Sequence, residues 1–342
     1  GIGKESLGGA NGTLLTGTNH SVAIGYQAAG NASGGWGNGV YIGYLTGNHD
    51  TGGGNVAVGY RAMEVASGST MTKNTAIGML SQQNISFNES QNNTSLGWQT
   101  LQGGSVTGQI KDNVAIGMGA LSSVTNAVGN TAIGGRSTLL GITTGGDNVA
   151  VGSGAGQTAT TTSDLVLLGK SAGNLFDGTG PNGSIAIGKS ALAAHTTGAR
   201  NIAIGWEAMH DTNAGSTAQG SSDNIFMGYS AGGGTWADAA SNQNVTIGNY
   251  TMDGALNGAS NNVAIGHQAL STITTEDDCV AIGYGAMYQG GGTADIAIGA
   301  QAMYQGPTGG NNYAIGRYSM MDVNAGSNAL SSNNNIAFGM GA

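Results

Sequence analysis

The sequence predicts an all-β fold, namely an elongated parallel β-solenoid or β-roll of about 18 short coils. A five-residue core of the form N-V-A-I-G recurs 18 times along the 342 residues, and successive cores lie 16 to 23 residues apart. Within the core, large apolar residues alternate with small ones, which is the period of a β-strand. A repeat of about 18 residues cannot bury its own apolar face, so copies must stack on one another. We therefore expect one repeat array over 1–342, with a degenerate first coil over 1–17 and eighteen repeats over 18–342.

The composition excludes several other classes of protein. Glycine accounts for 66 residues, proline for only 2, and charged residues for 8% of the chain. Collagen is excluded because glycine does not recur at every third position. No apolar stretch is long enough for a membrane span, and the net charge of −9 has the wrong sign for a nucleic-acid partner. The single Cys279 cannot form an internal disulfide, so stability must come from packing and pairing.

Each core ends in a glycine, here called the anchor glycine, and the columns before it alternate across the predicted strand. Three residues before it, 17 of 18 copies carry Val, Ile or Thr, and the residue just before it is always apolar. β-branched residues fit a pleated, buried surface, so we expect these two columns to form the core. Two residues before it, 13 copies have Ala, so this side should be flat and allow a second sheet or a neighbouring chain to pack closely. The clearest anchors are Gly25, Gly59, Gly78, Gly117, Gly134, Gly152, Gly205, Gly266, Gly283 and Gly316.

Asparagine occupies the position four residues before the anchor glycine in 12 copies. Asn tolerates left-handed backbone, and stacked Asn amides can bond along a ladder. We therefore predict a ladder of Asn turns in the stack. Its members are Asn55, Asn74, Asn93, Asn113, Asn130, Asn148, Asn201, Asn224, Asn244, Asn262, Asn312 and Asn335.

A second apolar strip follows the anchor glycine. The third residue after it is Ala, Ser or Thr in all 18 copies, and the fourth is Leu or Met in ten, for example Met63, Leu121 and Met209. We expect this strip to close the coil. The pattern leaves open whether the segment is a strand or a single helical turn.

The residue directly after the anchor glycine is often aromatic. Lys170, Lys189, His267 and Arg317 take the same slot in other copies, which favours an exposed stripe over a buried one. Such a stripe could bind sugar rings or pack against a sister chain, and our hypothesis places it at a subunit interface. The candidate contact residues are Tyr26, Tyr60, Trp98, Trp206, Tyr229 and Tyr284, with Tyr44 in the same column.

Motifs that suggest catalysis coincide with ordinary repeat positions. GYSAG at 228–232 and GKSAG at 169–173 match a serine nucleophile elbow, but Ser230 and Ser171 occupy a slot that is Gln or Glu in other copies. GSIAIGKS at 183–190 matches a phosphate loop, yet the strand residues lie inside the motif instead of before it. The histidines lack metal-ligand spacing, and Cys279 reads as a structural thiol. We expect no catalytic residue, no cofactor and no metal.

The repeat resembles the N-[TVS]-A-I-G-Y-x-A-L repeats of bacteriophage tail fibres, and it is similar to the SVAIG repeats in the head domains of trimeric autotransporter adhesins. The segments 262–270, 113–121 and 201–209 carry the resemblance most closely, and it covers nearly the whole chain. It implies a secreted or virion-borne homotrimer of parallel β-rolls that projects from a particle or cell and presents a binding tip.

The leading functional expectation is a non-enzymatic structural and adhesive segment of a phage or phage-like tail fibre. Its partners would be copies of itself and a cell-surface glycan or protein receptor. The alternative is a bacterial or archaeal surface adhesin or a self-assembling extracellular filament, and we expect a longer natural chain or terminal coils that pair with other subunits. A polysaccharide-cleaving tail spike would need paired carboxylates, whereas acidic residues are scattered here. Those in loops are Glu64, Glu89, Glu207, Asp238, Asp253 and Asp322.

Overall fold

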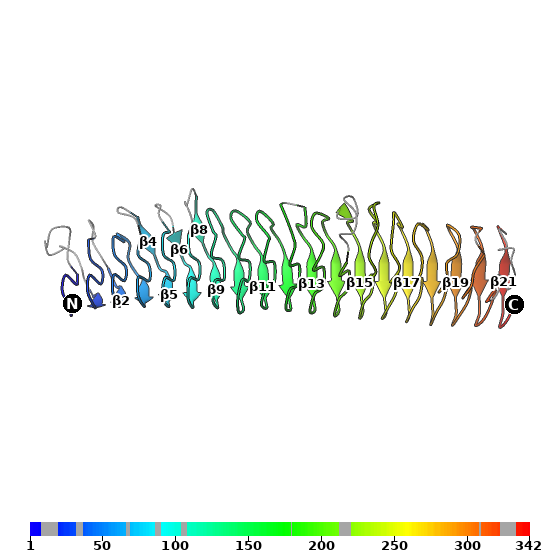
Figure 1. Ribbon diagram of the computed structural model, residues 1–342, viewed down its shortest axis with the longest axis horizontal. Coiled ribbons are helices and arrows are strands. Elements are labelled where there is room, and N and C mark those ends of the chain that lie inside the picture. Colours follow the sequence, from blue (N-terminus) through cyan, green and yellow to red (C-terminus); the bar gives the residue numbers. More distant parts are fainter. Residues whose placement is uncertain are drawn as a thin grey trace. The chain divides into compact units, whose positions relative to one another are not determined.

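The computed structural model describes residues 1–7, 20–31, 37–65, 69–85, 90–103, 108–178, 180–211, 220–307, 309–321 and 333–342. These residues form an all-β structure with no α-helix, and the fold is a parallel β-solenoid of about 15 turns (Figure 1). The predicted all-β, parallel solenoid class is therefore confirmed. Glu89 and Asp322 lie outside the described residues, as does most of the degenerate first coil.

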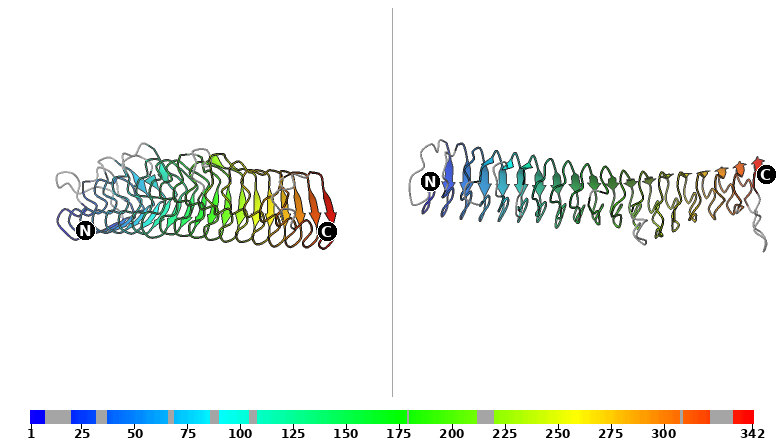
Figure 2. Two further views of the ribbon diagram at one scale, coloured as in Figure 1. Left: turned by 45° about the vertical axis from the view of Figure 1, so that its right-hand side comes forward. Right: turned by 90° about the horizontal axis from the view of Figure 1, so that it is seen from above.

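Contacts divide the chain into two units, each built from the same coil. Unit 1 comprises Gly1–Leu167 and Asp177–Thr179, and unit 2 comprises Leu168–Phe176 and Gly180–Ala342. Strand β12 (Val166–Leu168) contributes residues to both. Within each unit, three-residue strands pair in parallel, one per coil, as Figure 2 shows. The cores that the repeat predicts as strands are therefore strands.

The main sheet of unit 1 pairs its strands in chain order and without stagger. These strands are β1 (Val22–Ile24), β2 (Val40–Ile42), β3 (Val56–Val58), β5 (Thr75–Ile77), β7 (Thr94–Leu96), β9 (Val114–Ile116), β10 (Thr131–Ile133) and β11 (Val149–Val151). A second, short sheet lies in the connections of the same unit. It contains β4 (Met71–Thr72), β6 (Ser90–Gln91) and β8 (Ile110–Lys111).

Unit 2 repeats this arrangement, again in register, with each strand paired to the next one along the chain. Its strands are β13 (Ile185–Ile187), β14 (Ile202–Ile204), β15 (Ile225–Met227), β16 (Val245–Ile247), β17 (Val263–Ile265), β18 (Val280–Ile282), β19 (Ile296–Ile298), β20 (Tyr313–Ile315) and β21 (Ile336–Phe338).

The prediction that the Val and Ile columns form the core is wrong. In β14, Ala203 is fully buried, whereas Ile202 and Ile204 on either side of it remain partly exposed. The other three-residue strands show the same order, with the central residue turned inward. Small and flexible residues from the turn, such as Ala208 and Met209, complete the interior. The coil is narrow, so Ala faces inward and the larger β-branched residues face outward.

Bulky exceptions in the Ala column demonstrate how narrow the coil is. Tyr41 and Phe226 are both fully buried at this position. A Cβ on Gly47 would overlap the ring of Tyr41, and a Cβ on Gly232 would lie 2.5 Å from Cε1 of Phe226. Both glycines occupy the slot that is Leu or Met in most coils. One coil therefore accommodates one large side chain in its centre, from the strand or from the turn.

The second apolar strip lies inside the coil as predicted, since Met63, Leu121, Leu192 and Met287 are fully buried. The segment that carries it is neither a strand nor a helical turn. Its second and fourth residues adopt left-handed backbone, and their N–H groups bond in opposite directions along the stack. Glu207 donates its N–H to the carbonyl of Lys189 in the preceding coil, while Met209 donates to Ala231 in the following one. Backbone polar groups are thereby paired on the turn side as well.

The predicted Asn ladder is confirmed. Asn113 donates its backbone N–H and its Nδ2 to Oδ1 of Asn93, both at 3.0 Å, and Nδ2 also reaches the carbonyl of Ala127 at 2.9 Å. Unit 2 repeats the pattern, for example from Asn244 to Asn224 at 3.0 and 3.1 Å. These side chains are fully buried, and each amide bridges successive coils without a charge.

Candidate functional site

The outward side chains of the strands form an apolar surface on each unit, here called the sheet face. Val22 and Leu96 of unit 1 are 47% and 46% exposed, and Ile247 of unit 2 is 44% exposed. Alternate positions along a strand share a face, so each strand adds two such side chains in line with those of its neighbours. The result is a continuous apolar strip that carries no charged residue.

The candidate contact residues form a second exposed column, beside the sheet face. Every anchor glycine except Gly134 has a positive φ, which turns the backbone. The next side chain therefore points to solvent, as with Trp98, Trp206 and Tyr284, which are 43%, 50% and 55% exposed. We call this column the stripe. Tyr26 and Tyr60 are also exposed, and Tyr229 is partly exposed. Their predicted role in contacting a partner remains a prediction.

Rings of the stripe touch along the stack, but in different ways in the two units. In unit 1, Tyr26 and Tyr60 each stack on Tyr44, with centroids 5.2 and 5.4 Å apart and ring planes within 16° of parallel. In unit 2, five rings follow one another. The centroid separations are 5.5 Å for Trp206–Tyr229, 5.1 Å for Tyr229–Tyr250, 5.8 Å for Tyr250–His267 and 5.5 Å for His267–Tyr284.

Two members of the stripe were not apparent from the sequence columns. Tyr250 stands two residues after its anchor, yet its ring continues the series in unit 2. Arg136 also stands two residues after its anchor, but Gly154 donates its N–H to the Arg136 carbonyl, which is the bond made by the first residue of other turns. An extra residue in that turn displaces Arg136 by one position, and only the backbone pairing reveals it.

The stripe of unit 2 also carries cations. Nζ of Lys189 lies 4.8 Å from the ring centroid of Trp206, a cation–π contact between neighbouring coils. Lys170 and Arg317 are exposed in the same column, and the Arg317 guanidinium lies over the ring of Tyr318 at 4.5 Å. The cations therefore flank the series of rings on the same line, Lys170 and Lys189 before it and Arg317 after it.

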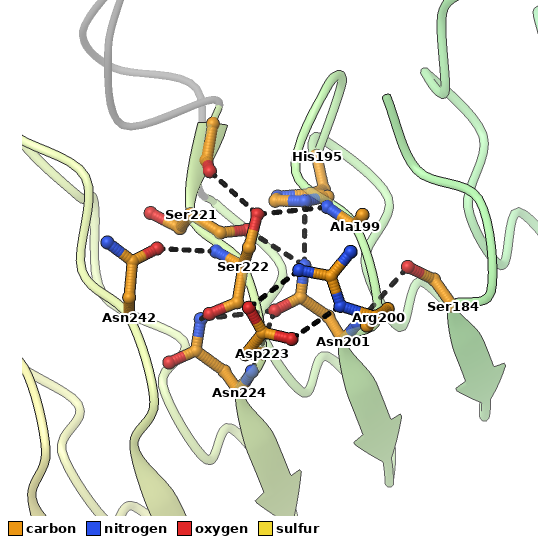
Figure 3. A network of polar contacts seen from close by, with 11 residues as sticks. Ser184, His195, Ala199, Arg200, Asn201, Ser221, Ser222, Asp223, Asn224 and Asn242 are labelled. Carbon is orange, nitrogen blue, oxygen red and sulfur yellow. Dashed lines mark hydrogen bonds and ion pairs between the residues drawn. The ribbon is translucent and has the colours of Figure 1, made fainter. Parts of the chain in front are cut away.

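A polar cluster on the connections of unit 2 surrounds the buried side chain of His195 (Figure 3). Its Nε2 lies 3.0 Å from both the Gly198 carbonyl and Nδ2 of Asn201. Burial lowers the pKa of His195 to about 4, so the imidazole is neutral at pH 7. Nearby, Arg200 donates two bonds to the carboxylate of Asp223, at 2.6 and 2.8 Å. These contacts tie one connection to the next, and the cluster is structural.

A buried carboxylate occupies unit 1 where the sequence columns gave no indication of one. Oδ1 of Asp50 accepts the N–H groups of Gly52 and Met71 at 2.9 and 3.1 Å. Its Oδ2 accepts Nδ2 of Asn55 at 2.9 Å and lies 3.4 Å from the hydroxyl of Tyr41. Burial raises the pKa of Asp50 to about 7 despite these donors. The carboxyl organises a connection next to the buried Tyr41.

The motifs set aside in the sequence occupy ordinary turn positions. Ser171 and Ser230 adopt left-handed backbone at the second position after the anchor, as Glu207 does. Lys189 lies on the stripe, and the residues before it form β13. Burial raises the pKa of the Cys279 thiol to about 12, which keeps it protonated. Throughout the described part of the chain, no three His, Cys, Asp or Glu side chains are grouped so that they could hold a metal ion.

In comparisons with known proteins, no family model matches the chain. A search of curated proteins also finds no match. Within the ranges that the structure describes, no helix has the length and apolar character needed to cross a membrane.

Proposed function

We propose that the chain is a non-enzymatic structural and adhesive segment of an extracellular fibre, part of a phage or phage-like tail fibre that projects from a virion and presents a receptor-binding surface. The observation that supports this proposal is the exposed apolar sheet face. A repeat whose strands are buried only on the Ala side leaves two rows of mostly Val and Ile side chains partly or largely exposed along the sheet. Such a surface suits assembly with copies of the same chain.

The extent of this surface argues for assembly. Unit 2 contributes nine consecutive paired strands, β13 to β21, which at ~4.8 Å per strand extend the sheet face over about 40 Å. A strip of that length and two side chains wide amounts to several hundred Å², at the upper end of the apolar patches found on monomers. Burial of apolar area contributes roughly 25 cal/mol per Å². Covering the sheet face by self-association therefore contributes several kcal/mol per unit, and a trimer around a common axis covers it on every copy.

Native mass in solution, measured together with negative-stain images of the purified chain, tests the proposal. A discrete trimer of elongated particles is the expected result. Open polymers of variable length would instead favour the alternative, a self-assembling filament or surface adhesin. A monomer at micromolar concentration would overturn both, because the sheet face would then remain uncovered.

A further inference from the structure

We infer that the stripe of unit 2, from Lys189 to Arg317, binds a linear acidic polysaccharide, with carboxylate groups on the sugar rings. This inference rests on the proposed adhesive function and names the ligand class of its contact surface. The site would be a line of exposed and partly exposed rings on successive coils, with Lys189 one coil before them and Arg317 two coils after them. The rings are Trp206, Tyr229, Tyr250, His267 and Tyr284.

The charge distribution along the chain supports an anionic ligand. The protein carries 9 Lys and Arg against 18 Asp and Glu, so an average exposed slot should hold twice as many acids as bases. The stripe reverses this ratio, since no coil has an Asp or Glu in it. Five of the nine cations lie there, namely Lys4, Arg136, Lys170, Lys189 and Arg317. The position after the stripe, two residues after the glycine, contains two acids, Glu5 and Glu207.

Acidic residues gather instead at the opposite end of the strands. The residue five positions before the anchor glycine is Asp in five coils, including Asp223 and Asp278 of unit 2. The coil therefore accepts acidic residues at an exposed turn, and it is the stripe in particular that lacks them. A carboxylate ligand would meet cations at the stripe, whereas the column at the other end of the strands of unit 2 holds two acids, Asp223 and Asp278, and one cation, Arg200, which is paired with Asp223.

Ring orientation in unit 2 favours sugar rings as the apolar part of the ligand. Parallel stacking in unit 1 covers the ring faces and leaves only edges to solvent. In unit 2 the planes of successive rings from Trp206 to His267 differ by 68°, 89° and 73°, and only the last pair, His267 and Tyr284, is stacked, at 14°. Such T-shaped pairs leave ring faces open, and exposed aromatic faces pack against the C–H groups of a saturated ring. Because the rings recur at the coil spacing of ~4.8 Å, an extended polymer contacts several at once.

The spacing of the cations favours a polysaccharide over single-stranded nucleic acid. Lys189 and Arg317 stand at the two ends of the ring series, seven coils apart. A nucleic acid brings one negative charge per nucleotide, and most of these would face an acidic protein without a cation. Few cations at the ends of a series of aromatic rings suit a polymer that is mostly neutral ring surface with intermittent carboxylates.

Calorimetric titration of the full chain with a ten-sugar hyaluronan oligosaccharide, which carries a carboxylate on every second ring, tests the inference, with a neutral malto-oligosaccharide of equal length and a (dT)10 oligonucleotide as comparison ligands. The variants are Trp206→Ala and the double variant Lys189→Gln with Arg317→Gln. Lys73→Gln removes an exposed cation outside the stripe. Tyr44→Ala removes a ring from the stacked series of unit 1, and native mass is measured for every variant.

We expect the hyaluronan oligosaccharide to bind more tightly than the neutral oligosaccharide or (dT)10, and more weakly as salt is raised. Trp206→Ala and the double cation variant should each weaken binding about tenfold at unchanged native mass, while Lys73→Gln and Tyr44→Ala should stay within about twofold. Absence of binding by the hyaluronan oligosaccharide would overturn the inference, as would equal losses for the matched variants or preferred binding of (dT)10. A change of native mass in the stripe variants would assign the stripe to a subunit contact instead. The proposed function fails separately, if the unmodified chain is a monomer.

Discussion

The anchor glycine illustrates how strongly one residue constrains the coil. Gly205 has a φ of 137°, in a region open almost only to glycine. A Cβ at this position would also overlap the carbonyl oxygen of Gly228 in the next coil. Backbone conformation and the approach of the next coil therefore both require glycine, so the repeat can vary in length but not at this position.

Replacement of this residue gives a direct test. Gly205→Ala should lower the free energy of unfolding by at least about 3 kcal/mol, because the substitution combines backbone strain with a clash against backbone that cannot rotate away. The drop in Tm by circular dichroism measures it. Gly220→Ala is the matched control, since an added Cβ there meets no atom of the described residues within 4 Å. Equal Tm values for the two variants would contradict the account.

Asp50 predicts a pH dependence of stability in unit 1. Its pKa rises from 3.8 to about 7 on folding because the carboxyl is buried. The folded state then holds the proton more tightly than the unfolded state, so the contribution of Asp50 is most favourable below pH 4 and is lost as the pH rises to 7. A pKa difference of about three units between the folded and unfolded states corresponds to about 4 kcal/mol in the free energy of unfolding.

We expect Asp50→Asn to change Tm less between pH 4.5 and 8 than the unmodified chain does. The measurement is the difference between the two Tm values for each protein, which is insensitive to any constant cost of the substitution. Asp164→Asn removes an exposed carboxylate of the same unit and should leave the difference unchanged. An Asp50→Asn profile parallel to that of the unmodified chain would show that Asp50 does not titrate in this range.

At the scale of one coil, the interior volume is shared between strand and turn. Phe226 fills the Ala position of β15, and Gly232 replaces the usual Leu or Met. The preceding coil has the common pair, Ala203 with Met209. Each arrangement places one large side chain in the coil, so the two positions should be coupled energetically.

A double-mutant cycle measures this coupling. Phe226→Ala alone should cost about 3 to 4 kcal/mol through the cavity that it leaves. Gly232→Met alone should cost several kcal/mol through overlap with the Phe226 ring. The double variant recreates the common pair and should recover at least about 2 kcal/mol relative to the sum, as read from Tm. Strict additivity would show that the interior is not shared.

Strand positions could be predicted from the sequence because the glycine and the alternation recur 18 times. The inward face could not, because both faces are apolar and alternation alone does not say which one turns inward. Side-chain volume decides it, through the distance between strand and turn. The bulky exceptions in the Ala column do indicate which face turns inward. The coil with Tyr41 has Gly47 in its turn, and the coil with Phe226 has Gly232. A glycine opposite each large side chain is needed only if the Ala column faces the turn.

The site was predictable in part for a similar reason. Exposure of the stripe followed from the cations in its slot, which could not be buried unpaired. The sheet face was missed because its residues were assigned to the core. Tyr250 belongs to the stripe because of the orientation of its ring, and Arg136 belongs to it because of one inserted residue. Neither cause leaves a pattern in the aligned columns.

For the whole molecule, the consequence is that stacking satisfies the backbone and leaves apolar surface outside. Ladders of main-chain bonds and of Asn amides pair the polar groups of each coil with its neighbours. Side-chain charge is not needed for this, which is consistent with a charged fraction of 8%. The remaining apolar rows lie on the sheet face, so solubility depends on what covers them.

Assembly through the sheet face predicts that one outward charge dissociates the oligomer without unfolding the coil. Ile247 is 44% exposed in the single chain, so Ile247→Lys should change its Tm little. At an interface the same lysine would be buried without a partner, at a cost of several kcal/mol, and native mass should fall to that of one chain. Asn261→Lys is the matched control, because it adds the same residue away from the sheet face. Asn261 stands five residues before its anchor glycine and has left-handed backbone, and another coil carries Lys73 at the same position. If the oligomer persists in Ile247→Lys but dissociates in Asn261→Lys, the copies meet at the turn that precedes the strands, where five coils carry Asp, and not at the sheet face.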